Sequence, residues 1–362
     1  MFRRHFVSLL AVLTAAAAAN ATMSFNLSNG TELAALQSSD PTLYAQVHNG
    51  FVAAAAMWSS QLTDTVTVNI TINYSNLQNS TFLGQSSHAQ TYDTYSSVKS
   101  ALVSHATSAN DAMAIAHLPA TRLSFYTNIA TANPSARYLD NLNRPWNNGL
   151  TLANANAKAL GLLPADDPGK DGSITFNTQF SWDFDRSNGI ASGTYDFVGV
   201  AAHEIGHSLG FVSGVDTVDY YSAPKGPSPL ALSQQSNIFT PLDLYRHSST
   251  DGGNLELSTL VPSYLSVDGG TTNSGSLSTG AYNGLDTPTR QASHWQDGLG
   301  LGIMGPTIGS GKLLTISNTD LMAFDVIGYG VVPEPGIFFL ALAPSMMLLR
   351  RARRAPLREV DA

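Results

Sequence analysis

Residues 203–211 read HEIGHSLGF, a stretch of the form H-E-x-x-H-x-x-G, and the rest of the chain is interpreted around it. On a helix, His203 and His207 lie about 40° apart around the axis, so both imidazoles can reach one metal ion. Neutral imidazole suits zinc, and a catalytic zinc ion keeps one position open for water. The pKa of that water falls to about 7, and Glu204 stands beside the first ligand as a base for its proton. The segment therefore predicts a zinc site that hydrolyses amides.

The residues around the motif favour this interpretation over a chance match on a surface helix. Residues 197–209 are almost entirely apolar apart from the His-Glu-His set. A helix that is apolar nearly all round is buried, and buried His and Glu side chains need partners, of which a metal is the simplest. Gly210 is expected to end the helix, because glycine adopts the left-handed conformation at little cost. The chain can then turn back beneath the metal.

The pattern resembles that of the metzincin zinc peptidases. Their usual continuation, H-x-x-G-x-x-H, would place a third ligand at position 213, where this chain has Ser213. A neutral hydroxyl is a poor zinc ligand beside imidazole. Asp216 carries a carboxylate, but it lies nine residues past His207 instead of six.

The order of residues after the motif resembles one metzincin branch, the leishmanolysin-like peptidases. That branch carries a long insertion before a third histidine and a methionine turn soon afterwards. In this chain His294 lies 87 residues beyond His207, and Met304 follows ten residues later. The resemblance implies that His203, His207 and His294 bind Zn²⁺ and that Met304 forms a hydrophobic floor beneath it. Core filling is the alternative for Met304, and His247 is a rival ligand; the chain also departs from the branch in having no cysteine.

The fold class implied by the resemblance is α+β, a zincin/metzincin-like domain of two lobes. Residues 22–211 would form an N-terminal catalytic lobe, with a twisted mixed sheet and two helices, the second of which carries H-E-x-x-H. Residues 212–330 would form a loop-rich C-terminal lobe that holds a long insertion over 212–290, the third histidine, the methionine turn and a terminal helix.

Short-range patterns predict the individual elements. Asp40 as N-cap, followed by Pro41, opens a helix with an apolar stripe along one side. Alternation of Val and Ile with Thr and Asn predicts a half-buried strand over 65–74, and the polar residues 75–91 are expected to form a loop. Further elements are expected as a helix over 95–102, a strand within 122–129, a short helix ending at Gly161, and a terminal helix from Ser317 to Gly328.

Residues 173–177 are predicted to form a short strand after the Asp171-Gly172 turn. In metzincins an edge strand lies along the cleft and pairs with extended substrate. The resemblance makes 173–177 a candidate for that strand, and an interior strand is the equal alternative.

Residues 1–21 have the features of a secretory signal. Arg3 and Arg4 form a basic start, an apolar run follows over 6–19, and 19–21 form an A-x-A cleavage site. A buried N-terminal helix is the alternative. Because the chain has no cysteine, an exported form has no disulfide framework and depends on its core and bound metal for stability.

Residues 331–354 form a tail of three parts. A Pro-Glu-Pro segment at 333–335 precedes the apolar run 336–349, and four arginines lie within 350–354. The run is short for a spanning helix, and basic residues after it stay in the cytoplasm. This tail, with its basic end continuing to residue 362, resembles the PEP-CTERM sorting signal of Gram-negative bacteria. The resemblance implies transient insertion in the inner membrane and recognition by an exosortase-type sorting enzyme; a plain C-terminal anchor is the alternative.

The charge of the remaining body bears on its partners. The whole chain has a formal net charge of −8, and between 22 and 332 there are 11 basic and 23 acidic residues, so the body carries about −12. An acidic body of this kind argues against nucleic acid as a partner.

These patterns together predict a secreted or cell-surface zinc-dependent endopeptidase that acts on protein or peptide substrates. The alternative from another class is a non-catalytic extracellular matrix or surface protein on a zincin scaffold with structural zinc. Glu204 favours the enzyme, because a structural site has no use for a carboxylate beside its ligands.

Overall fold

The computed structural model describes residues 23–79, 81–128, 137–222, 237–280 and 290–333. The expected secretory signal over 1–21 lies outside these residues, as does the sorting signal from residue 334 onward. The described residues form a mixed α+β structure, which confirms the α+β class. Within these ranges no helix has the length and apolar character needed to span a lipid bilayer.

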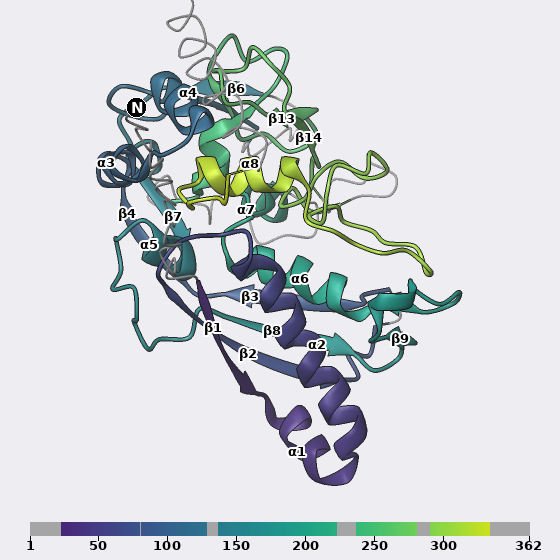
Figure 1. The fold of residues 1–362 in the computed structure, drawn as a ribbon. Coiled ribbons are helices and arrows are strands. Elements are labelled where there is room, and N and C mark those ends of the chain that lie inside the picture. The colour runs from purple at the N-terminus through teal and green to yellow at the C-terminus, as the bar shows by residue number, and fades with distance from the viewer. Residues whose placement is uncertain (1–22, 80, 129–136, 223–236, 281–289, 334–362) are drawn as a thin grey trace, which may run out of the picture.

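A four-stranded mixed sheet forms the base of the molecule (Figure 1). Its order is β1 (Ser24–Asn29), β2 (Thr67–Ser75), β8 (Gly172–Asn177) and β3 (Gly84–His88). The first three strands run parallel and β3 runs antiparallel to β8. In β2 the buried residues alternate with half-exposed ones, so one face of the sheet is covered.

Two helices cover that face, α2 (Pro41–Ser59) and α6 (Phe197–Ser208). The ring of Phe176 from β8 lies 5.1 Å from the ring of Phe51 in α2 and 4.6 Å from the ring of Phe197 in α6. Both helices therefore pack on the same side of the sheet, as the expected arrangement of a mixed sheet with two helices requires. The Trp58 indole of α2 also donates a hydrogen bond to the Ala202 carbonyl of α6, at 2.7 Å.

The expected start of α2 is present in the structure. The Asp40 carboxylate accepts a hydrogen bond from the Leu43 amide at 3.0 Å, and Pro41 occupies the first helical turn. Gly50 lies where the helix meets α6, because a Cβ there would be 2.4 Å from the Phe197 ring. The absence of a side chain at Gly50 thus allows the two helices to approach closely.

The strand over 173–177 is an interior strand, which confirms the interior alternative and excludes the edge-strand candidate. It belongs to β8, which hydrogen-bonds to β2 on one side and to β3 on the other. The edge strand next to β8 is β3, which lies in the stretch 75–91 that was expected to be a loop. The same stretch contains the first residue of β4 (Gln90–Thr94), which pairs with β7 (Gly149–Ala153). Strands β3 and β4 are polar on both faces, so they lack the apolar alternation by which strands are recognised.

Other elements of the first 200 residues were partly expected. Helix α3 (Tyr95–His105) and strand β5 (Phe125–Thr127) lie where they were predicted, and α5 (Asn154–Ala159) ends just before Gly161, which has φ +67°. The further unpredicted elements are β1, α1 (Thr31–Ser39), α4 (Ala109–His117), β6 (Tyr138–Asp140), β7, β9 (Trp182–Asp183), β10 (Tyr195–Asp196) and two short 3₁₀ turns, Pro145–Asn147 and Arg186–Asn188.

The described parts of 212–290 contain more regular structure than the expected loop. They begin with α7 (Val215–Ser222), and a 3₁₀ helix spans Pro241–Tyr245. Short strands follow as β11 (Arg246–His247), β12 (Leu255–Glu256), β13 (Ser263–Leu265) and β14 (Gly275–Leu277). They form two small three-stranded sheets, one of which includes β5 and β6.

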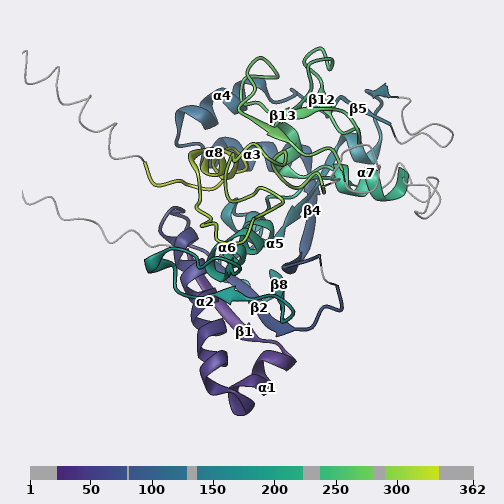
Figure 2. The ribbon, with the colours of Figure 1, turned by 90° about the vertical axis from the view of Figure 1, so that its right-hand side faces the viewer.

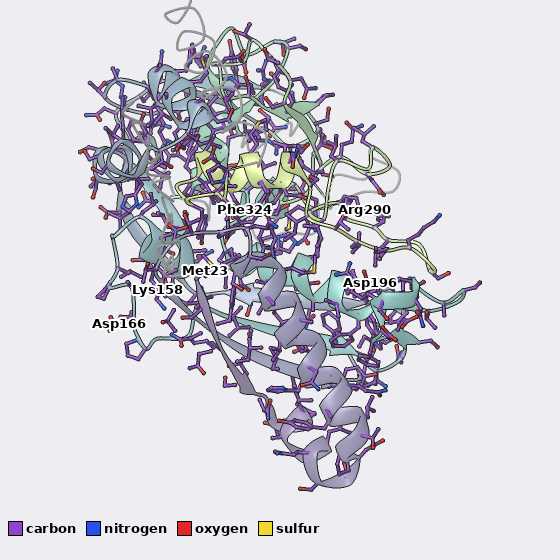
Figure 3. The ribbon with its side chains drawn as sticks, in the orientation of Figure 1. Met23, Lys158, Asp166, Asp196, Arg290 and Phe324 are labelled. Atoms are coloured by element: carbon purple, nitrogen blue, oxygen red, sulfur yellow. The ribbon has the colours of Figure 1, made fainter. Side chains whose placement is uncertain are left out.

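The terminal helix α8 (Asn318–Val326) has the expected ends. Ser317 and Asp320 form a capping box, and Gly328 follows the C-cap with φ +106°. Phe324, which is labelled in Figure 3, lies 4.5 Å from the Trp58 ring and 6.1 Å from the Phe211 ring. In Figures 1 and 2, α6 lies between the four-stranded sheet and α8. The motif helix is therefore enclosed from both sides.

Candidate metal centre

Helix α6 begins at a buried, charged cap. The Asp196 carboxylate, labelled in Figure 3 at the start of α6, accepts a hydrogen bond from the Gly199 amide at 2.9 Å. The same carboxylate forms an ion pair with Arg186 at 3.1 Å and accepts the Leu314 amide at 3.0 Å. A negative charge at this end also interacts favourably with the helix dipole. These contacts fix the axis that carries His203 and His207.

The three histidines expected as ligands converge. The Nε2 atom of His207 lies 3.1 Å from Nε2 of His203 and 3.1 Å from Nε2 of His294. The ring of His207 stands at 88° and 83° to the other two, whose rings are nearly parallel at 14°. Among the described residues, these three are the one group of His or acidic side chains arranged to hold a metal ion.

Backbone carbonyls hold the far side of each ring. Nδ1 of His203 lies 2.7 Å from the Ile303 oxygen, and Nδ1 of His207 lies 2.8 Å from the Phe211 oxygen. Nδ1 of His294 lies 3.1 Å from the Gln291 oxygen. A carbonyl only accepts, so each Nδ1 carries the proton and each Nε2 directs a lone pair toward the other two. Three lone pairs at this distance repel one another unless a cation lies between them.

Burial favours the neutral form of two of the imidazoles, those of His207 and His294. Loss of hydration lowers the pKa of His207 well below its usual value, and the neighbouring His203 and His294 lower it further. Burial also lowers the pKa of His294, to about 3, with His203 as the next cause. Neutral imidazole is the form that binds metals, so the side chains of His207 and His294 are in the metal-binding form at neutral pH.

Gly210 shapes the turn that supplies one of these carbonyls. It has φ +112°, the Gly210 amide donates to the His207 carbonyl at 3.0 Å, and the Phe211 amide donates to the Gly206 carbonyl at 3.1 Å. This pair of bonds is the Schellman pattern of a helix C-terminus. It turns Phe211 back so that its carbonyl meets the His207 ring.

Met304 lies under the helix, where the methionine turn was expected. Its side chain is fully buried, and a Cβ on Gly206 would lie 2.4 Å from the Met304 sulfur. The Asp320 carboxylate of α8 holds the turn, accepting the Ile303 amide at 2.8 Å and the Met304 amide at 3.2 Å. It also accepts the Trp295 indole N–H at 2.8 Å, next to His294. The Asp320 carboxylate thus links Met304 with Ile303, whose carbonyl accepts from His203, and with Trp295, the residue after His294.

The Glu204 side chain extends from α6 toward β3. The residue is 7% exposed, and among the described residues its carboxylate has no hydrogen-bond partner. A Cβ on Gly84 of β3 would lie 3.3 Å from Glu204 Oε1, so the glycine leaves the carboxylate its space. A carboxylate that is buried but without a protein partner is free to exchange a proton with a bound molecule.

A cleft of about 460 Å³ opens beside His207. One wall is formed by the alternate residues Ser86, His88, Gln90 and Tyr92, which run from β3 into β4. His88 lies in this wall, where burial lowers its pKa, and its ring contacts the Gln90 amide at 2.9 Å. The cleft is otherwise lined by Thr151, Val212, Ser213, Gly214, Asp216, Thr217, Tyr221, Asn237, Ile238, Thr240, Gln291 and Ser293.

The alternative ligands lie elsewhere. The Ser213 hydroxyl donates to Asp243 at 2.6 Å, and the Asp216 carboxylate accepts from the Ala292 and Ser293 amides. His247 pairs with Asp251 at 3.0 Å. None of the three alternative residues belongs to the His203, His207 and His294 group.

The chain was compared with protein-family models, with curated proteins and with solved structures, and no match was found.

Proposed function

We propose that this chain is a zinc-dependent endopeptidase. The observation that carries the proposal is the convergence of His203, His207 and His294, two of which lie on the helix that also carries Glu204. Zinc binds imidazole nitrogen at about 2.0–2.1 Å, which places the nitrogens of a tetrahedral site about 3.3 Å apart. The separations of 3.1 Å from Nε2 of His207 to Nε2 of His203 and of His294 are close to this spacing.

The residues of the chain divide the reaction among them. When bound, zinc supplies Lewis-acid polarisation of the scissile carbonyl and lowers the pKa of a water molecule to about 7. Glu204 takes the proton of the attacking water and returns it to the amine nitrogen that leaves. The backbone carbonyls behind the three rings keep them oriented and increase their basicity.

Extended peptides fit the free edge of β3. As the last strand of its sheet among the described residues, β3 has one side available for pairing with another strand. Gly84 of β3 adjoins Glu204, and Ser86 and His88 face the cleft. We expect a substrate to add a strand along β3, which brings its backbone past the metal site.

The test is Glu204→Gln in the full-length chain, assayed on a casein-type protein substrate with and without a chelator. Loss of the general base is expected to reduce proteolysis by about 10² to 10⁴-fold. Zinc content and the thermal transition should stay at the wild-type level, because Glu204 is not a ligand in this assignment.

The outcomes separate the two functional classes. A metal-replete Glu204→Gln protein with wild-type activity would overturn the mechanism. A wild-type protein that binds one zinc and cleaves nothing would instead support the non-catalytic matrix or surface protein.

We also propose that the chain is exported and sorted through its tail, on the sequence features of 1–21 and 331–354. The exported form is expected to end near residue 333 after passing through a membrane-bound form. Mass spectrometry of the extracellular protein measures this end directly. Residues 350–362 on the mature protein would exclude sorting of this type.

A further inference from the structure

The peptide that leads into His294 is held by one carboxylate from a distant part of the chain. Oδ1 of Asp216 accepts the Ala292 amide at 2.6 Å, and Oδ2 accepts the Ser293 amide at 3.0 Å. The Ser293 hydroxyl also donates to Oδ2. Both oxygens are therefore occupied by the two residues just before His294.

The turn that follows α6 holds the same peptide from a second direction. The Ser213 amide donates to the Ser293 hydroxyl oxygen at 2.8 Å. The Ser213 hydroxyl and the Gly214 amide donate to the two oxygens of Asp243, at 2.6 and 2.7 Å. Ser213 occupies the position of the third histidine in the pattern H-E-x-x-H-x-x-G-x-x-H. In this chain it binds Ser293, the residue just before His294.

A buried cation balances these carboxylates. Arg246 is fully buried, and its guanidinium donates to the Ser278 carbonyl at 2.7 Å and to the Ala292 carbonyl at 3.5 Å. Its charge attracts both Asp243 and Asp216 and offsets part of the cost of burying them. The cluster is thus a buried network of opposite charges joined by hydrogen bonds, in which Nε of Arg246 has no hydrogen-bond partner among the described residues.

We propose that Asp216 is a positioning residue for the third metal ligand. In the commonest spacing a short turn of chain carries the third histidine to the metal, whereas here 87 residues separate His207 from His294. A long connection does not by itself fix the position of the third imidazole, so a contact elsewhere in the fold must do so. Asp216 fixes it by binding Ala292 and Ser293 to the first turn of α7, directly after the motif helix. This inference rests on the proposed role of His294 as a metal ligand.

The chemistry of the contact defines the variant. Asp216→Asn keeps the size of the side chain and one acceptor oxygen. The other oxygen is replaced by an amide N–H₂, which is a donor facing a backbone N–H donor, so one of the two hydrogen bonds to Ala292 and Ser293 is lost. The displaced peptide should release His294. We expect zinc affinity, measured by competition with a chromophoric chelator on the full-length chain in mild detergent, to fall by about 10 to 100-fold.

Two comparisons separate positioning from general support of the fold. In a His294→Ala background, Asp216→Asn should cause no further loss of zinc affinity, because the ligand that it positions is already missing. The visible spectrum of the Co²⁺-loaded Asp216→Asn protein should match that of Co²⁺-loaded His294→Ala. The matched control is Asp251→Asn, which removes a buried carboxylate whose contacts all lie within 247–253. It should lower stability and leave zinc affinity unchanged.

The results decide the inference separately from the proposed function, because none of them needs proteolysis. Wild-type zinc affinity in Asp216→Asn, or an equal loss with and without His294, would overturn the inference alone. A wild-type chain that binds no zinc would overturn both. If Asp216→Asn does not fold, Ser293→Ala gives the same comparison with a smaller expected loss, since it removes the hydroxyl that both Asp216 and Ser213 contact.

Discussion

Replacing Gly206 with alanine tests whether Met304 holds the floor of the metal site. Helix propensity alone predicts that an alanine in the middle of α6 stabilises the protein by about 1 kcal/mol. The structure predicts the opposite, because the new Cβ would lie 2.4 Å from the Met304 sulfur, 3.1 Å from its methyl carbon and 3.2 Å from Trp58. Contact at an ordinary distance requires the sulfur to move by about 1 Å.

That movement is resisted by the methionine turn. Asp320 holds the amides of Ile303 and Met304, and the Ile303 carbonyl is the acceptor of His203. Overpacking of a core costs about 1–3 kcal/mol, so we expect a net loss of about 1–2 kcal/mol in the free energy of unfolding. We also expect weaker metal binding, since the acceptor behind His203 shifts with the turn.

A double-mutant cycle isolates the contact. Met304→Ala alone leaves a cavity and should cost about 2–5 kcal/mol. In the double variant the methyl of Ala at 206 enters that space, so the total should be smaller than the sum by about 1 kcal/mol or more. Urea denaturation of the metal-free chain measures all four proteins. A Gly206→Ala variant as stable as wild type, or strict additivity, would refute the packing argument.

Three further predictions follow from the same structure. Gly210→Ala places a side chain at φ +112° and displaces the Phe211 carbonyl, so stability should fall by about 1–2 kcal/mol and zinc affinity should fall with it. The control is Gly193→Ala, at φ +85° in open space, which should lower stability alone. Equal zinc affinity in the two variants would count against the role of the turn. Burial, and then the nearby Asp111, raise the pKa of Asp325 from 3.8 to about 6, so the folded state binds more protons than the unfolded state between these values, and this carboxyl lowers stability as pH rises through that window. Asp325→Asn should therefore stabilise the protein more above pH 6 than below 3.8, as measured by urea denaturation at both, and an equal gain would contradict the shifted pKa. Zinc at 100 times its dissociation constant should raise the free energy of unfolding by about 2.7 kcal/mol, and a chelator should reverse the gain; an unchanged thermal transition would argue against binding to the folded state.

The elements that the sequence predicts correctly are those with strong local signals. Helix α2 combines an N-cap, a proline and an apolar stripe, and α8 has a capping box and a terminal glycine, so each is specified by neighbouring residues. Strands β3 and β4 carry no such signal. They are polar on both faces, and β3 owes its place at the sheet edge to pairing with β8, nearly 90 residues away in sequence.

The site divides in the same way. Helical spacing brings His203 and His207 together, whereas the place of His294 follows from a resemblance in the order of residues and from no local rule. The supporting contacts could not be predicted. Backbone carbonyls carry no residue signature, and Asp216 and Ser213 were assessed only as ligands. Polar residues that hold one segment of chain to another become visible only when the segments meet.

The Asp320 contacts determine when the three-histidine centre is completed during synthesis. The third histidine, the methionine turn and the carboxylate that joins them all lie more than 80 residues after the H-E-x-x-H helix. At about 5–20 residues per second, a growing chain carries the first two histidines for roughly 6 to 23 s before Asp320 is made. Throughout that interval the three-histidine centre lacks His294 and its floor. Under the proposed function, a nascent chain therefore cannot cut itself or its neighbours until nearly all of the described residues have been synthesised.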